Sequence, residues 1–228
     1  MTAKRIFTDQ ELKEMGTRTL DLVLEAIDAG DKEKAKALAQ RMYKEFNYLH
    51  DGYGFWVSGL QTFIYKNYGI EALEKAEREA HTTEAKVVFK PPEKKDIRSL
   101  VEHLAGGLRG HLQPISIKED DEKITLTMQP CGSGERIVQN GGYEAGLARV
   151  KDPHRITWGM KDFPIYCVHC PVMEMLDVEN TGNFMAVHIV SEPIYQGSCQ
   201  FAFYKNPSEI PEEFYTRIGK RPPKRISE

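Results

Sequence analysis

Hydrophobic residues recur at helical spacing through the first third of the chain. Thr8 and Glu11 form a capping-box pattern, in which each side chain can bond a backbone amide of the first turn. An apolar stripe at helical spacing follows it: Leu12, Met15, Leu20, Val23, Leu24 and Ile27. Gly30 ends this first predicted helix, and a further stripe predicts a second helix up to His50.

A third helical segment is predicted before Gly69. It carries apolar side chains at positions i, i+4, i+7 and i+8: Trp56, Leu60, Phe63 and Ile64. A short helix follows to about residue 80. We interpret His50-Asp51 as a capped polar pair at a helix kink, because adjacent helical residues diverge too far to reach one ion. These patterns predict a bundle of three or four helices.

Alternation of apolar and polar residues dominates the later part of the chain. Residues 114–118 and 123–128 alternate, and the acidic residues 119–122 between them predict a hairpin. Further strands are expected at 164–167, 184–191 and 198–204. The fold class predicted is therefore α+β, with an N-terminal helical bundle followed by a mainly antiparallel sheet domain that carries a Cys/His site.

Residues 90–95 separate the two patterns. Their two prolines and charged side chains interrupt both helix and sheet. We therefore expect a helical bundle over residues 1–89 and an α+β domain over residues 90–228. The second part is predicted to begin with a helix at 96–108 and to contain a long loop at 132–162 with one helical turn.

Composition narrows the classes of function. With 228 residues and 40% hydrophobic content, the chain can form a sizeable core. No apolar run reaches the roughly 18 residues of a membrane span. The N-terminus shows no signal peptide, so we expect a cytoplasmic protein with reduced thiols. The net charge of −3 argues against nucleic-acid binding.

Cysteine and histidine are concentrated in one short segment. Cys167, His169 and Cys170 lie within four positions, and a Cys-x-x-Cys turn is the usual start of a tetrahedral zinc site. On a strand, Cys167 and His169 would share a face while Cys170 points away. In a turn, the two cysteines would converge and His169 could point elsewhere. Pro171 favours a turn or a strand end at this point.

The other two cysteines leave several readings open. Cys131, in a glycine-rich loop, is the third predicted metal ligand beside Cys167 and Cys170. Cys199, His169, His111 or water would be the fourth. Zinc is the expected metal, and iron or an iron–sulfur cluster remains an alternative. The cysteines could also be buried apolar residues, or reactive thiols without a metal.

The loop that contains Cys131 is also a candidate substrate site. Gly132 and Gly134 allow close backbone approach, and successive amides in such a turn can bind an anion. We predict Gly132, Ser133 and Arg136 as substrate-binding residues, although a tight turn leaving a strand would need the same glycines.

Two histidines are predicted to act as acid or base. His169 lies among the cysteines, and His111 ends the stretch between the predicted helix and the first strand. Both belong to the residue type that titrates near neutral pH. His188 alternates with Met185 and Val187, and we interpret it as a satisfied sheet residue.

The order of these motifs resembles an uncharacterised family of soluble bacterial proteins. The resemblance rests on the elements Arg109-Gly-His111, Pro130-Cys-Gly-Ser-Gly134, Tyr166-Cys-Val-His-Cys170 and Cys199-Gln-Phe. More distantly, Gly197-Ser-Cys-Gln-Phe201 is similar to aminothiazoline-carboxylate hydrolase-like and 4-vinyl-reductase-like domains. The similarity implies an α+β fold, and the hydrolase group implies cleavage of a cyclic C–N bond.

The predicted function is that of a cytoplasmic zinc-dependent hydrolase that acts on a small anionic substrate. Cys131, Cys167 and Cys170 would hold zinc, which lowers the pKa of a bound water to about 7. Two alternatives are a non-catalytic module that senses a metal or a small ligand, and a metal-free cysteine enzyme. The expected partner is a small molecule, and a homo-oligomer is possible.

Overall fold

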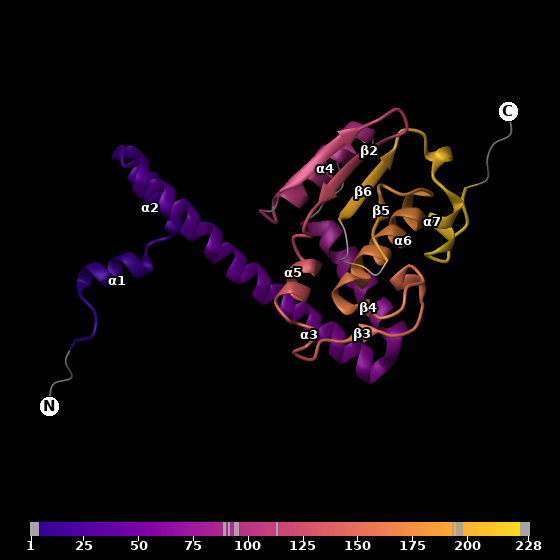
Figure 1. The fold of residues 1–228 in the computed structure, drawn as a ribbon, viewed down its shortest axis with the longest axis horizontal. Helices are drawn as coiled ribbons and strands as arrows, with labels where there is room; N and C mark the ends of the chain where they lie inside the picture. The colour runs from indigo at the N-terminus through magenta and orange to yellow at the C-terminus, as the bar shows by residue number, and fades with distance from the viewer. Residues whose placement is uncertain are drawn as a thin grey trace. The chain divides into compact units, whose positions relative to one another are not determined.

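The computed structural model describes residues 5–88, 90, 92–93, 96–112, 114–192, 194 and 198–223. It has the predicted α+β fold, with long helical segments first and a mainly antiparallel sheet later (Figure 1). The chain divides into two compact units, Met1–Gly52 and Tyr53–Glu228. The predicted division at residue 89 lies further along the chain and stays a prediction. The predicted linker at residues 90–95 falls partly outside the described residues.

Two short helices open the first unit. α1 spans Asp9–Gly16 and begins with the predicted capping box, in which Glu11 N donates to Thr8 Oγ1 at 3.2 Å and Thr8 N to Glu11 Oε2 at 2.7 Å. α2 spans Thr19–Asp28, so the single helix predicted here is two helices. Most of the predicted stripe is exposed in this unit: Leu12, Met15, Leu20, Leu24 and Ile27.

The long helix α3 spans Lys32–Val87. Its backbone leaves helical geometry only at Gly69, with φ 85°, which confirms the predicted break there. His50 and Asp51 lie inside α3, so they do not cap a helix end, and the predicted kink beside them stays a prediction. In the second unit, one face of α3 buries Ser58 and Gln61, whereas Trp56, Leu60 and Phe63 of the predicted bundle stripe are exposed.

A four-stranded antiparallel sheet forms the centre of the second unit (Figure 1). Its strands are β1 (Ile115–Glu119), β2 (Lys123–Met128), β6 (Cys199–Tyr204) and β5 (Val187–Ile189), side by side in that order. β1 and β2 form the predicted hairpin, and β6 matches its prediction closely. β5 is shorter than the predicted strand at 184–191.

Helix α4, Ile97–Arg109, packs on one face of this sheet. It begins as predicted, with the Asp96 side chain accepting from Ser99 N at 2.9 Å. Ala105 and Leu108 of α4 form a core with alternate residues of β2 and β6: Leu126, Met128, Phe201 and Phe203. The alternation that predicted these strands therefore marks the face that α4 covers.

The remaining elements of the second unit are short. They are α5 (Gly134–Gln139), the paired strands β3 (Arg149–Val150) and β4 (Phe163–Pro164), the 3-10 helices η1 (Arg155–Thr157), η2 (Ile165–Val168) and η3 (Pro207–Glu209), and the helices α6 (His169–Thr181) and α7 (Glu212–Thr216). A second core joins several of them through Ile156, Phe163, Val172 and Ile218. The region predicted as a long loop thus contains one short helix, as expected, and also η1 and β3.

The strand predicted at residues 164–167 is wrong. Only Pro164 is in a strand, and η2 leads directly into α6, so Cys167, His169 and Cys170 lie in helical structure. Pro171 is the third residue of α6. Proline is tolerated there because amides of the first helical turn have no intrahelical acceptor.

None of the helices within the described residues has the length and apolar content needed to cross a membrane.

Candidate functional site

The loop after β2 positions Cys131 next to α5. It contains a cis peptide bond between Gln129 and Pro130. Cys131 N donates to Glu135 Oε2 at 2.9 Å, which connects the loop to the first turn of α5. A Cβ atom on Gly132 would lie 2.6 Å from His111 Cβ, so these two predicted residues lie in close contact. The close approach to His111 is itself a reason for glycine at this position.

Cys199 supplies the neighbouring thiol. It is the first residue of β6 and pairs with Met128, the last residue of β2, three positions before Cys131. The interaction with the Cys199 thiol lowers the pKa of Cys131 to about 6, and the amides of Ser133, Glu135 and Gly134 add to this against the effect of burial. The same interaction and burial raise the pKa of Cys199 well above its usual value. At neutral pH, Cys131 is therefore a thiolate and Cys199 a thiol.

In the predicted Cys/His segment, His169 contacts a backbone carbonyl group and the Cys170 thiol. His169 Nδ1 lies 2.6 Å from the Tyr166 carbonyl oxygen, which can only accept, so Nδ1 carries the proton. Nε2 is then an acceptor for the Cys170 thiol at 3.3 Å. Burial and the nearby His81 lower the pKa of His169 to about 4, which keeps the imidazole neutral at pH 7. His169 is therefore bonded at both nitrogens.

Cys199 interacts electrostatically with the other three cysteines, and we call the four residues the thiol cluster. Burial raises the pKa of Cys170 well above its usual value, and negative charge on Cys167 and Cys131 adds to it. Cys167 and Cys170 are three residues apart in helical structure, which places their side chains on one side of the helix. The sequence analysis expected a strand or a turn here, and the structure has a helix instead.

The sulfurs are not arranged as a ready tetrahedral metal site. In such a site, bonds of about 2.3 Å bring the sulfurs to roughly 3.8 Å from one another. Within the described residues, no three atoms drawn from different residues among the cysteine sulfurs and the nitrogens of His111 and His169 lie within 4.8 Å of one another. Zinc binding by Cys131, Cys167 and Cys170 would therefore require these side chains to move.

The predicted substrate-binding residues lie on the same loop and helix. Ser133, at the start of α5, is buried and its hydroxyl interacts with that of Tyr166. Burial raises the pKa of Tyr166, and the neighbouring cysteines add to the effect, so its hydroxyl stays protonated. Arg136 follows in α5. The CGSG loop and the Cys/His segment, predicted from separate motifs, thus meet at Ser133 and Tyr166.

A buried carboxylate network, which the sequence analysis missed, involves the same helix α6. Glu174 is 1% exposed, and its oxygens accept from Trp158 Nε1 at 2.7 Å, from His188 N at 2.7 Å and from Arg217 Nη2 at 2.7 and 3.0 Å. Although burial opposes it, bonding to His188 and the charge of Arg217 lower the pKa of Glu174. The network connects α6, β5, the residue that follows η1 and the residue that follows α7.

The prediction that His188 is a fully hydrogen-bonded sheet residue is wrong. The carboxylate network holds one of its ring nitrogens, and the other has no partner within the described residues. Its Nδ1 donates to Glu174 Oε1 at 3.0 Å, and its ring lies 5.3 Å from that of Trp158 and 4.5 Å from that of Phe201. Nε2 is buried and has no hydrogen-bond partner among the described residues. A histidine oriented by a carboxylate, with its second nitrogen open, is an arrangement found in general bases and metal ligands.

A second polar network lies on α3. Gln61 Nε2 donates to the buried Glu77 at 2.9 Å, and His81 Nε2 lies 3.6 Å from Glu77 Oε2. The His81 ring is 5.9 Å from that of His169. Against the effect of burial, bonding to Glu77 raises the pKa of His81. The helical spacing of Glu77 and His81 is a sequence signal for this pair, but nothing in the sequence points to its contact with His169.

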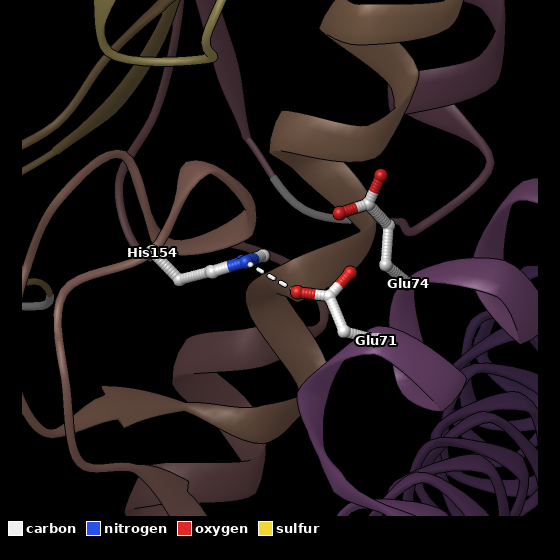
Figure 2. Close-up of side chains that lie close together, drawn as sticks. All are labelled: Glu71, Glu74 and His154. Carbon is white, nitrogen blue, oxygen red and sulfur yellow. Dashed lines mark ion pairs between the residues drawn. The ribbon is translucent and has the colours of Figure 1, made fainter.

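Within the described part of the chain, one group of potential metal ligands lies outside the thiol cluster. Glu71, Glu74 and His154 have donor atoms within 4.8 Å of one another, and His154 forms an ion pair with Glu71 (Figure 2). However, the oxygens of Glu74 already accept from Arg155 Nε at 2.7 Å and Arg78 Nε at 2.8 Å. A cation would have to displace two guanidinium groups, so we interpret the group as an ion-pair clamp between α3 and η1.

Two other features do not belong to the thiol cluster. His50 and Asp51 lie in the first unit, with His50 Nδ1 3.7 Å from Asp51 Oδ1. An open surface hollow is lined by Glu122, Asn206, Ser208 and Glu209, none of which carries a thiol or imidazole. Neither feature adds a group to the candidate site.

Comparison with known proteins finds no match for this chain among family models, curated proteins or solved structures. The resemblance to the bacterial family with the CGSG and YCxHC motifs therefore stays a prediction.

Proposed function

We propose that this protein is a cysteine-dependent enzyme that hydrolyses a C–N bond of a small substrate, with Cys131 as the nucleophile. The observation that carries the proposal is the pKa of Cys131, which the Cys199 thiol and three backbone amides lower to about 6. A thiolate is the form of cysteine that attacks an electrophilic carbon. The resemblance to aminothiazoline-carboxylate hydrolase-like domains supports the choice of a C–N bond.

In the proposed reaction, Cys131 Sγ forms a bond to the electrophilic carbon and the C–N bond breaks. The leaving nitrogen takes a proton, for which Tyr166 and Cys199 are the candidates because their raised pKa values keep them protonated. Water then replaces the sulfur and restores the thiolate. His111, which contacts Gly132, is the candidate base for that water. Ser133 and Arg136 are the candidates for binding an anionic group of the substrate.

A zinc-dependent hydrolase is the second candidate. The gathering of Cys131, Cys167, Cys170 and Cys199 in one electrostatic neighbourhood supports it. Cys131, Cys167 and Cys170 would bind the metal after a rearrangement of their side chains. A non-catalytic sensing module would use the same thiols without reacting.

The test uses p-nitrophenyl acetate, an activated ester that acylates reactive thiolates. We expect a burst of about one p-nitrophenolate per chain, with a rate that rises with pH through a midpoint near 6. Cys131→Ala should abolish the burst because it removes the nucleophile. Stopped-flow absorbance at several pH values measures both the amplitude and the midpoint.

Metal analysis of anaerobically purified protein separates the candidates. A metal-free protein whose burst survives in Cys167→Ala supports the thiol enzyme. One equivalent of zinc that is lost in Cys167→Ala supports the zinc hydrolase. If neither a burst nor a metal is found, both enzyme proposals fail and the sensing module remains.

A further inference from the structure

An apolar seam lies on the outer face of α3 in the second unit. It consists of Tyr53, Trp56, Leu60 and Phe63, which are 55%, 63%, 52% and 54% exposed. The intervals of three, four and three residues match the a and d positions of a heptad repeat. Because Ser58 on the other face of the helix is completely buried, the seam lies opposite the surface that α3 uses in its own fold.

The same repeat continues upstream in the sequence. Leu49, Phe46 and Met42 precede Tyr53 at intervals of four, three and four residues. Within the first unit, Met42 and Leu49 are exposed as well. An isolated amphipathic helix needs only a stripe with a period near 3.6, whereas a strict 3.5-residue repeat over three heptads is typical of a helix that packs along another helix.

Two glycines flank the seam at the same heptad position. Gly52 and Gly59 are seven residues apart, and a Cβ atom on either would meet no protein atom within 4 Å. The fold of the single chain therefore gives no packing reason for glycine at these helical positions, where glycine costs roughly 0.5–1 kcal/mol relative to alanine. Small residues beside a seam allow the backbone of a partner helix to approach closely.

We propose that this seam binds the same seam of a second copy of the chain, so that the protein is a homodimer held by paired α3 helices. The repeat runs through three heptads of the sequence, from Met42 to Phe63. Of the helices in the described residues, α3 alone combines this length with a matching repeat.

The composition of the seam fits such an interface. Trp, Tyr, Phe and Met are enriched at the centres of protein interfaces, and charged side chains are depleted there. In a two-fold symmetric dimer, one patch contacts its own copy and must therefore be self-complementary, which an uncharged aromatic and aliphatic seam satisfies. This inference does not depend on the proposed chemistry of the thiol cluster.

The proposal is tested by sedimentation velocity of the full chain. Concentrations from about 1 to 200 µM bracket a micromolar Kd. We expect wild-type protein to sediment with twice the 26.0 kDa chain mass at the higher concentrations. Leu60→Lys should sediment as a monomer because it introduces a charge into the seam. Ile117→Lys is the matched control, since Ile117 is 49% exposed on β1 and outside the seam, and it should remain dimeric.

Tryptophan fluorescence provides a second readout. Trp56 is the exposed tryptophan and Trp158 the buried one, so association should shift the emission of Trp56 to shorter wavelength as concentration rises. Circular dichroism verifies that Leu60→Lys keeps its helix content. A wild-type chain that stays monomeric at every concentration overturns the proposal, as does a folded Leu60→Lys variant that still dimerises. Monomeric protein with a shielded Trp56 at every concentration would mean that another part of the chain covers the seam.

Discussion

At the scale of single residues, the thiol cluster gives two cysteines opposite pKa shifts and therefore different protonation states at neutral pH. Cys131 and Cys199 both lie at the end of the β2–β6 pair, yet one has a lowered pKa and the other a raised pKa. The asymmetry arises because one sulfur accepts from backbone amides and from the other thiol. The sequence indicated that both residues were candidates, but the direction of the shifts depends on amide orientation that no residue pattern encodes.

Removing the Cys199 thiol should therefore raise the pKa of Cys131. We expect Cys199→Ala to shift the midpoint of Cys131 alkylation by iodoacetamide upward by about one pH unit or more, because the hydrogen bond from Cys199 is the largest contribution. Cys199→Ser keeps a donor and should shift it less. Mass spectrometry of the Cys131 peptide over pH 5–9 measures the midpoint. Equal midpoints in wild type and Cys199→Ala would contradict this account.

At the scale of elements, the patterns predicted strands more accurately than the helix that carries the site. β1, β2 and β6 alternate clearly because one face packs on α4, and they were predicted within one or two residues. α6 was missed because Pro171 was interpreted as an end. Its position in the first turn and Gly182 after the last turn are the signals that delimit this helix.

Gly182 tests the element boundary directly. It ends α6 with φ 81°, and a Cβ atom there would meet no atom within 4 Å, so only backbone strain opposes a side chain. We expect Gly182→Ala to lower the free energy of unfolding by about 1 kcal/mol. Gly106→Ala, at an exposed position inside α4, should raise it by roughly 0.5–1 kcal/mol. Urea denaturation of both variants measures the contrast, and a loss of stability of the same size in both would refute the backbone explanation.

At the scale of the whole molecule, apolar periodicity predicts helices but not what covers them. The stripe of Trp56, Leu60 and Phe63 correctly indicated a helix, whereas the structure leaves the stripe exposed. Burial of charge was equally invisible in the sequence. Nothing in the sequence around Glu174 distinguishes it from a surface glutamate. Its partners Trp158, His188 and Arg217 come from segments that are distant in sequence.

The stability of the molecule should depend on pH in opposite ways through two carboxyl groups of α6. Burial, with the nearby charge of Glu174, raises the pKa of Asp177 to about 7, whereas bonding to His188 and the charge of Arg217 lower that of Glu174 despite burial. For Asp177, the folded state binds the proton more tightly, so stability is lost as pH rises from about 4 to 7. For Glu174, the stabilisation is present above the unfolded pKa and is lost as pH falls through the folded one.

Two isosteric variants measure these contributions separately. Asp177→Asn keeps an oxygen that accepts from Met185 N and cannot ionise. Its free energy of unfolding relative to wild type should therefore rise between pH 4 and 7 and stay constant above pH 7. At pH 8 the difference should be about 1 kcal/mol or more. Glu174→Gln leaves Arg217 buried without its partner and should cost about 3 kcal/mol at pH 7, with a smaller difference at low pH. Urea midpoints at pH 4, 5.5, 7 and 8 give both curves. The two residues are one helical turn apart and share the same buried surroundings. If the stability of both variants relative to wild type changed with pH in the same direction, burial alone would set the two pKa values, and the bonds of Glu174 to His188 and Arg217 would not.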